Sequence, residues 1–166
     1  MKYRTLIVMA LGVLIGTNVF AAAMTKEHLS QLAGKGNAIK IIKPNQLQWR
    51  HSSVLPEDEK IALLFGDPTK PGIFMMQVRL PKDYRGTPHT HPYNAYANVV
   101  SGLLYIGTGK HFDKSKLRAI PAGSSFLIPA KVPHFEWTNE VTKVQVVARG
   151  PFSSDYIDTS KHPSIK

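Results

Sequence analysis

Three histidines stand at spacings that suit a metal site. His89 and His91 are two positions apart, and side chains two apart on an extended strand point to the same face. Both imidazoles can therefore reach one point in space. His134 begins another strand-like run further along the chain. Imidazole nitrogens suit Zn, Cu, Fe and Ni, so the pattern indicates a transition-metal site. The alternative is a set of turn or surface histidines.

The residues around these histidines resemble the two sequence motifs of the cupin superfamily. The matching positions are His89, His91 and Gly102 in the first motif and Gly123, Pro129 and His134 in the second. The resemblance extends from about residue 61 to residue 156. It implies an all-β, single-domain cupin, that is, one double-stranded β-helix or jelly-roll barrel, with the three histidines as metal ligands.

Both motifs depart from the cupin pattern. Ala95 stands where the first motif carries a glutamate ligand, and Asp83 replaces its leading glycine. In the second motif Lys131 replaces the inner glycine and Thr138 the closing asparagine. Some iron-dependent dioxygenases of this fold use only three histidines, so the resemblance still allows a metal. Other cupin-like chains that have lost ligands serve as binding modules.

Glu136 offers a substitute carboxylate ligand. It follows His134 by two positions, so on a straight strand both side chains face the same way. An inward carboxylate must then be paired or metal-bound, because an unpaired buried charge is costly. A bulge after His134 would instead turn Glu136 toward water. The sequence leaves both alternatives open.

A further expectation concerns the pocket beside the metal. In residues 141–149, one face of the expected strand carries Lys143, Gln145, Val147 and Arg149, and the other carries Val144, Val146 and Ala148. If the polar face lines the barrel mouth, Gln145 and Arg149 could hold an anionic ligand, with Tyr96 in the aromatic lining. Burial of the apolar face would give the same pattern with no ligand.

The elements that must position these side chains are mostly strands. Turn-rich segments separate short apolar runs at 61–65, 73–80, 96–101, 103–106, 117–120, 125–128, 134–137 and 141–149. Strands at this spacing, without long helices between them, are typical of a sandwich or barrel. The runs beside Gly102 predict a tight hairpin. Residues 107–118 read as a polar insertion on the rim, with His111 exposed, and residues 25–34 as a short N-terminal helix.

The N-terminus predicts export. Two basic residues precede an apolar run at 6–16, and alanines at 21–23 suit signal-peptidase cleavage. This pattern is typical of a secretory signal peptide, and the run is short for a bilayer span. A retained anchor is the alternative. We expect a periplasmic or secreted protein without stable membrane insertion after cleavage. The chain has no cysteine, which excludes disulfides and thiolate ligands.

These features divide the chain into four parts. They are a signal peptide at 1–23, an N-terminal helix and extension at 24–60, the cupin β-barrel at 61–156 and a C-terminal tail at 157–166. The net charge of +10 falls to about +8 on cleavage. The lysines are scattered and lack the interleaved aromatic residues of a nucleic-acid platform, so we expect no nucleic-acid partner.

The sequence thus predicts an exported metal-binding cupin. It would act on a small molecule, either neutral or anionic. The metal would be Fe, Mn, Ni or Zn, serving an oxygenase- or isomerase-like enzyme as a Lewis acid or as a site for dioxygen. A non-catalytic small-ligand-binding module is the main alternative, and a structural barrel with relic histidines is another. The resemblance also implies a homodimer, because cupins of this size pair through their sheets.

Overall fold

The computed structural model describes residues 38–51 and 59–158. The expected signal peptide and the helix expected at 25–34 lie outside the described residues. The described elements are η1 (Pro44–Gln46), β1 (Arg50–His51), β2 (Lys60–Phe65), β3 (Gly72–Leu80), β4 (His89–Thr90), β5 (Ala95–Ser101), β6 (Leu103–Thr108), η2 (Lys114–Lys116), β7 (Arg118–Pro121), β8 (Ser125–Ile128), β9 (His134–Thr138), β10 (Thr142–Gly150) and β11 (Asp155–Tyr156). No helix in these two ranges has the length and apolar character needed to cross a membrane.

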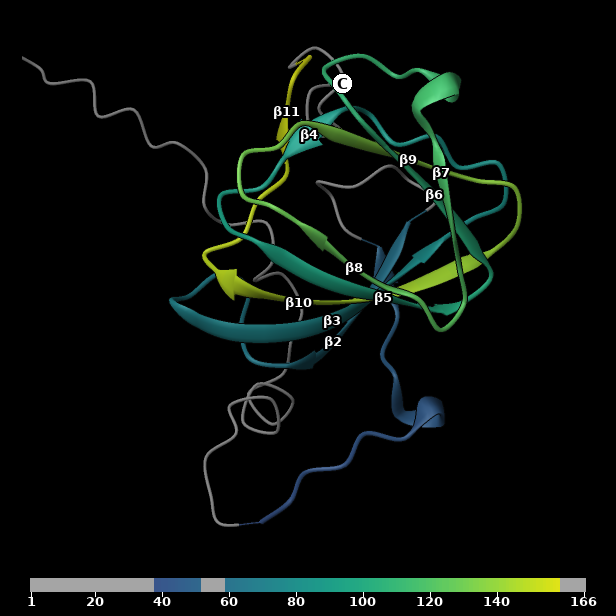
Figure 1. The fold of residues 1–166 in the computed structure, drawn as a ribbon. Helices are drawn as coiled ribbons and strands as arrows, with labels where there is room; N and C mark the ends of the chain where they lie inside the picture. Colours follow the sequence, from purple (N-terminus) through teal and green to yellow (C-terminus); the bar gives the residue numbers. More distant parts are fainter. Residues whose placement is uncertain (1–37, 52–58, 159–166) are drawn as a thin grey trace, which may run out of the picture.

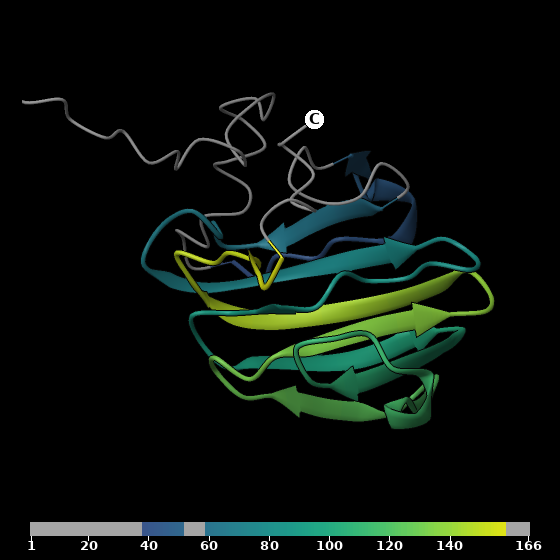
Figure 2. The same cartoon turned by 90° about the horizontal axis from the view of Figure 1, so that it is seen from above.

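The strands form two facing sheets, which confirms the all-β prediction. One sheet has the order β1-β2-β3-β10-β5-β8 and the other the order β11-β4-β9-β6-β7. Figure 1 shows them as the lower and upper layers of the molecule. Seen from above in Figure 2, the long strands lie roughly along one direction, as in an aligned sandwich. The chain passes repeatedly from one sheet to the other, which is the connectivity of a jelly roll.

The predicted tight hairpin at Gly102 is wrong. β5 and β6 do meet there, but β5 belongs to the six-stranded sheet and β6 to the five-stranded one. Gly102 has a φ of +81°, and a Cβ at this position would lie 2.7 Å from the carbonyl oxygen of Val141. Glycine therefore permits a sharp corner that carries the chain between sheets. The hairpin in this region instead joins β6 to β7.

The apolar core lies between the sheets. Side chains alternate along each strand, so every second residue of β3, β5 and β10 faces the opposite layer. These residues form two clusters of buried apolar side chains. One contains Leu80, Ala97, Val99, Leu104 and Val144, and the other contains Phe74, Met76, Ala95 and Ala148.

The segment between β6 and β7 covers the outer side of β9. Phe135 is fully buried, and its ring centroid lies 5.1 Å from that of Phe112 in this segment. Gly107 leaves room for the same ring, since a Cβ there would lie 2.4 Å from it. His111 is exposed, as expected. This packing fixes β9, the strand that carries His134 and Glu136.

Candidate metal centre and its cavity

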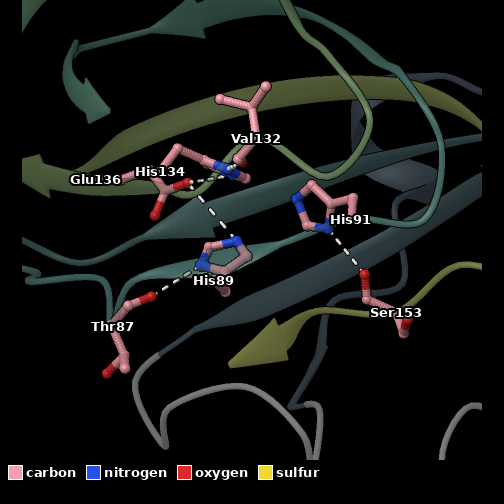
Figure 3. Close-up of polar contacts among 7 residues, drawn as sticks. All are labelled: Thr87, His89, His91, Val132, His134, Glu136 and Ser153. Atoms are coloured by element: carbon pink, nitrogen blue, oxygen red, sulfur yellow. Dashed lines mark hydrogen bonds and ion pairs between the residues drawn. The ribbon is translucent and has the colours of Figure 1, made fainter. Parts of the chain in front are cut away.

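The structure brings His89, His91 and His134 together. His89 on β4 lies directly opposite His134 on β9 in the antiparallel register, and His91 follows β4. One ring nitrogen from each of the three lies within 4.8 Å of the others. Figure 3 shows the three rings turned toward one another. Residues from two neighbouring strands therefore supply a compact set of three imidazoles.

Backbone carbonyls hold all three rings in place. The Nδ1 atoms of His89 and His91 lie 2.8 Å from the carbonyl oxygens of Thr87 and Ser153, and His134 Nδ1 lies 2.9 Å from that of Val132. A carbonyl oxygen can only accept, so each Nδ1 carries the proton and donates it. The Nε2 lone pairs are then free to bind a metal, and this support is typical of metal-ligating histidines.

Burial keeps at least two of the imidazoles neutral. It lowers the pKa of His91 to about 3, with a further contribution from the neighbouring His89. It also lowers the pKa of His134, against the opposing effect of Glu136. His134 Nε2 is buried and has no hydrogen-bond partner. A buried polar atom without a partner is costly, and a metal cation would satisfy it.

Glu136 faces the histidines. β9 continues without a bulge from His134 to Thr138, in regular register with β6, so the straight-strand alternative is the one that the structure has. The Oε1 atom of Glu136 lies 3.4 Å from His134 Nε2 and 3.9 Å from His89 Nε2. A carboxylate oxygen and imidazole lone pairs pointing at one place repel one another unless a cation or a proton lies between them.

Gly86 makes room for this carboxylate. Its backbone N–H donates to the carbonyl oxygen of Glu136 at 2.8 Å. A Cβ at position 86 would lie 2.5 Å from Oε2 of the same glutamate. The loop before β4 can therefore approach β9 closely only because this residue has no side chain.

His89, His91 and Glu136 border a largely apolar cavity of about 110 Å³ between the sheets. Ala95 lines it together with His89 and His91, so the position of the absent cupin glutamate does face the site. The remaining lining residues are Glu59, Met76, Val78, Leu80, Tyr84, Ala97, Leu104, Ile106, Phe126, Ile128, Val144, Val146, Phe152, Ser154 and Tyr156.

Gln145, Arg149 and Tyr96 do not line this cavity, contrary to the expectation from the sequence. Val144 and Val146 point into it, so their neighbours on β10 point outward. Tyr96 and Arg149 border a separate hollow on the outer face of the sheet. The alternative reading, burial of the apolar face of β10, is therefore the arrangement observed.

The sequence reasoning missed Glu59, Tyr84 and Tyr156. Glu59 stands in an acidic stretch that reads as solvated, and Tyr84 stands in a turn-rich segment. The structure buries Glu59, with 3% of its surface exposed. Only the position of Glu59 just before the apolar run 61–65 hinted at burial, and that signal is weak.

Comparison with known proteins gives structural matches only. No protein-family model and no curated protein matches the chain. The polyketide cyclase RemF from Streptomyces resistomycificus superposes with a TM-score of 0.62 at 15% identity, over 76% of this chain and 91% of that one. An RmlC-like cupin from Shewanella frigidimarina gives 0.54 at 15% identity, over 68% and 91%.

An enzyme with a bound small molecule is also similar. Salicylate 1,2-dioxygenase from Pseudoaminobacter salicylatoxidans, as an adduct with gentisate, gives a TM-score of 0.50 at 11% identity, over 61% of this chain and 30% of that one. At such identities a structural likeness establishes the fold alone. The chain has the cupin fold, and its three-histidine group lies in a position that could bind a metal.

Proposed function

We propose that the protein is a metal-binding cupin whose cavity holds a small molecule beside the metal. The observation that carries this proposal is the convergence of three backbone-anchored imidazoles on one point. His89, His91 and His134 would hold a divalent transition metal such as Fe, Mn, Ni or Zn. A bound metal would supply a Lewis acid or a site at which dioxygen reacts.

Glu136 would be the fourth ligand. The carboxylate that other cupins place at the position of Ala95 would here come from β9 instead. Support comes from the 3.4 Å separation between Glu136 Oε1 and His134 Nε2, and from the absence of any lysine or arginine among the described residues that line the cavity. Without a metal cation, Glu136 has no positive side chain to face among the described residues that line the cavity.

Metal affinity of matched variants tests this assignment. The wild type should bind one equivalent of metal, measured by titration with Mn, Fe, Ni and Zn. Glu136→Gln should weaken binding about tenfold or more, the scale for losing a supporting group, and Ala95→Glu should strengthen it by adding a second carboxylate. His111→Ala removes an exposed histidine and is the control. Unchanged affinity in Glu136→Gln, with the protein folded, would contradict its role as a ligand.

The fold neighbours include enzymes of more than one class, and we propose an oxygenase- or isomerase-like activity. What supports catalysis is a metal site beside a largely apolar cavity, where electrostatic interactions are stronger than in water. Turnover of small oxygenated molecules that requires both metal and His134 would bear this out. Stoichiometric ligand binding without turnover would favour the non-catalytic binding module.

We further propose that the protein is exported and forms a homodimer. The basic, then apolar, then small-residue order of residues 1–23 supports export, and the N-terminal sequence of the protein recovered from cells tests it. The outer face of the six-stranded sheet exposes several large apolar side chains, which supports pairing through that sheet. They include Ile73, Tyr96, Val100 and Leu127. A monomeric mass by light scattering at micromolar concentration would contradict the dimer.

A further inference from the structure

We propose that Glu59 and Tyr84 form a second, uncharged polar site in the cavity, and that it selects a ring-sized ligand with a carbonyl or hydroxyl group over a carboxylate. The inference deepens the proposed function, on which it rests for the cavity being a ligand site. Glu59 precedes β2 and Tyr84 lies between β3 and β4, so neither belongs to the strands that carry the histidines.

The two side chains form a pair inside the cavity. Glu59 is 3% exposed, and its carboxyl group accepts a hydrogen bond from the Tyr84 hydroxyl. The backbone of Tyr84 is fixed on the end of β9, since its carbonyl accepts from the N–H of Thr138 at 3.1 Å and its N–H donates to the Thr138 hydroxyl at 3.2 Å. The pair is therefore held in place before any ligand arrives.

The surroundings favour an uncharged Glu59. No lysine or arginine lines the cavity in the part of the chain that the structure describes. The ionisable residue Glu136, which lines the same cavity, is acidic as well. Burial raises the pKa of Glu59 to about 8, Tyr84 opposes that rise, and Glu136 adds to it. A protonated carboxyl that accepts from Tyr84 still has an O–H to donate. That donor faces the cavity and suits a carbonyl or hydroxyl oxygen.

The size and lining of the cavity limit the rest of the ligand. Its volume of about 110 Å³ is somewhat below the ~150 Å³ of an engineered cavity that binds benzene. The part of the ligand inside the cavity is then no larger than about one six-membered ring. Most lining side chains are aliphatic or aromatic, so that ring should be mainly apolar.

A ligand carboxylate would meet no cation among the described residues that line the cavity. The Glu59 O–H can donate to it, but the ligand's negative charge would lie near Glu136 uncompensated, and desolvating that charge would be costly. Arg149, the cationic residue expected to serve an anionic ligand, borders the hollow on the outer face instead. An anionic group could be accepted only at the metal.

Binding of two probes of equal ring size tests the proposal. Cyclohexanone and cyclohexanecarboxylate are titrated into the full chain, metal-free and zinc-loaded, and dissociation constants are taken from NMR shifts of backbone amides. Cyclohexanone should bind the metal-free protein at least tenfold more tightly than the carboxylate. Zinc should narrow that difference by giving the carboxylate a partner. Equal binding of both probes to the metal-free protein, or no binding of the ketone, would overturn the proposal.

Three variants identify the residues responsible. Glu59→Gln keeps a neutral donor and acceptor and should bind cyclohexanone within about threefold of wild type. Glu59→Leu removes the donor and should weaken binding about tenfold, the scale of one buried hydrogen bond. Tyr84→Phe should also weaken ketone binding. It provides an independent test in case Glu59→Leu does not fold. Equal losses in Glu59→Gln and Glu59→Leu would show that an ionised carboxylate is needed and would refute the assignment.

The same samples separate this inference from the proposed function. Zinc content is measured in each variant alongside ketone binding. If the wild type does not bind zinc but Glu59→Leu still weakens cyclohexanone binding, the metal centre alone is refuted. Normal zinc binding with no effect of Glu59→Leu and Tyr84→Phe on the ketone would refute the second polar site alone.

Discussion

Replacing Glu59 by glutamine should change how the stability of the protein depends on pH. Burial raises the pKa of this carboxyl from 4.5 to about 8 in the folded protein. In the unfolded chain the group loses its proton near its usual value. Between these two values the unfolded state binds fewer protons than the folded state, so folding stability falls as the pH rises.

The magnitude follows from the difference between the two pKa values. At about 1.4 kcal/mol per pKa unit, moving from 4.5 to about 8 corresponds to about 5 kcal/mol. The whole contribution is present below pH 4.5 and is lost by pH 8. Glu59→Gln has no proton to lose, so its stability relative to wild type should increase by about this amount between pH 4.5 and pH 8. The ionisable groups facing Glu59 are Tyr84, Glu136 and Tyr156.

Urea unfolding provides the measurement. Metal-free wild type and Glu59→Gln are compared at pH 5, 6.5 and 8 in the presence of a chelator, and the difference between their free energies of unfolding is plotted against pH. Glu140→Gln alters an exposed carboxylate and is the control, with a difference that stays flat. A flat difference for Glu59→Gln as well would refute the reasoning, because the carboxyl would then be ionised in the folded protein.

Three other changes test the packing, the metal site and the assembly. Gly107→Ala should destabilise the protein by about 1–3 kcal/mol, since a Cβ would lie 2.4 Å from the Phe135 ring, and urea unfolding would show a lower midpoint. Zinc at a hundred times its dissociation constant should stabilise the wild type by about 2.7 kcal/mol, and thermal melts should show this gain lost in His134→Ala but kept in His111→Ala. Tyr96→Lys places a charge on the exposed outer face of the six-stranded sheet and should shift the proposed dimer toward monomer, while unchanged dimer affinity by light scattering would contradict an interface on this face.

The sequence predicted the strands well because their apolar runs are short and bounded by turn residues. The runs at 73–80, 125–128 and 141–149 lie within a residue of β3, β8 and β10. The corner at Gly102 was missed because a glycine between two strands is compatible both with a hairpin and with a crossing between sheets. Which one forms depends on partners far along the chain, such as β10 and β9.

The histidine group was accessible to sequence reasoning because two of its members are two residues apart and the motifs place the third. The inward face of β10 could not be assigned from the sequence, because alternation gives two faces without showing which one lies inside the barrel. Glu59 was hidden for a different reason. Glu59 interacts with Tyr84 and Glu136, which lie far along the chain, so the residues beside Glu59 in the sequence do not indicate these contacts.

One contact in the candidate metal centre ties it to the end of the described chain. His91 is oriented by the carbonyl oxygen of Ser153, its ring stacks on Phe152 at 4.5 Å, and β11 pairs with β4 beside it. A chain that stops after β10 would hold all three histidines yet leave one of them unoriented. At the proposed metal site, tight binding would therefore be acquired only once residues 151–156 have folded onto β4, and metal occupancy would then distinguish finished molecules from incomplete ones.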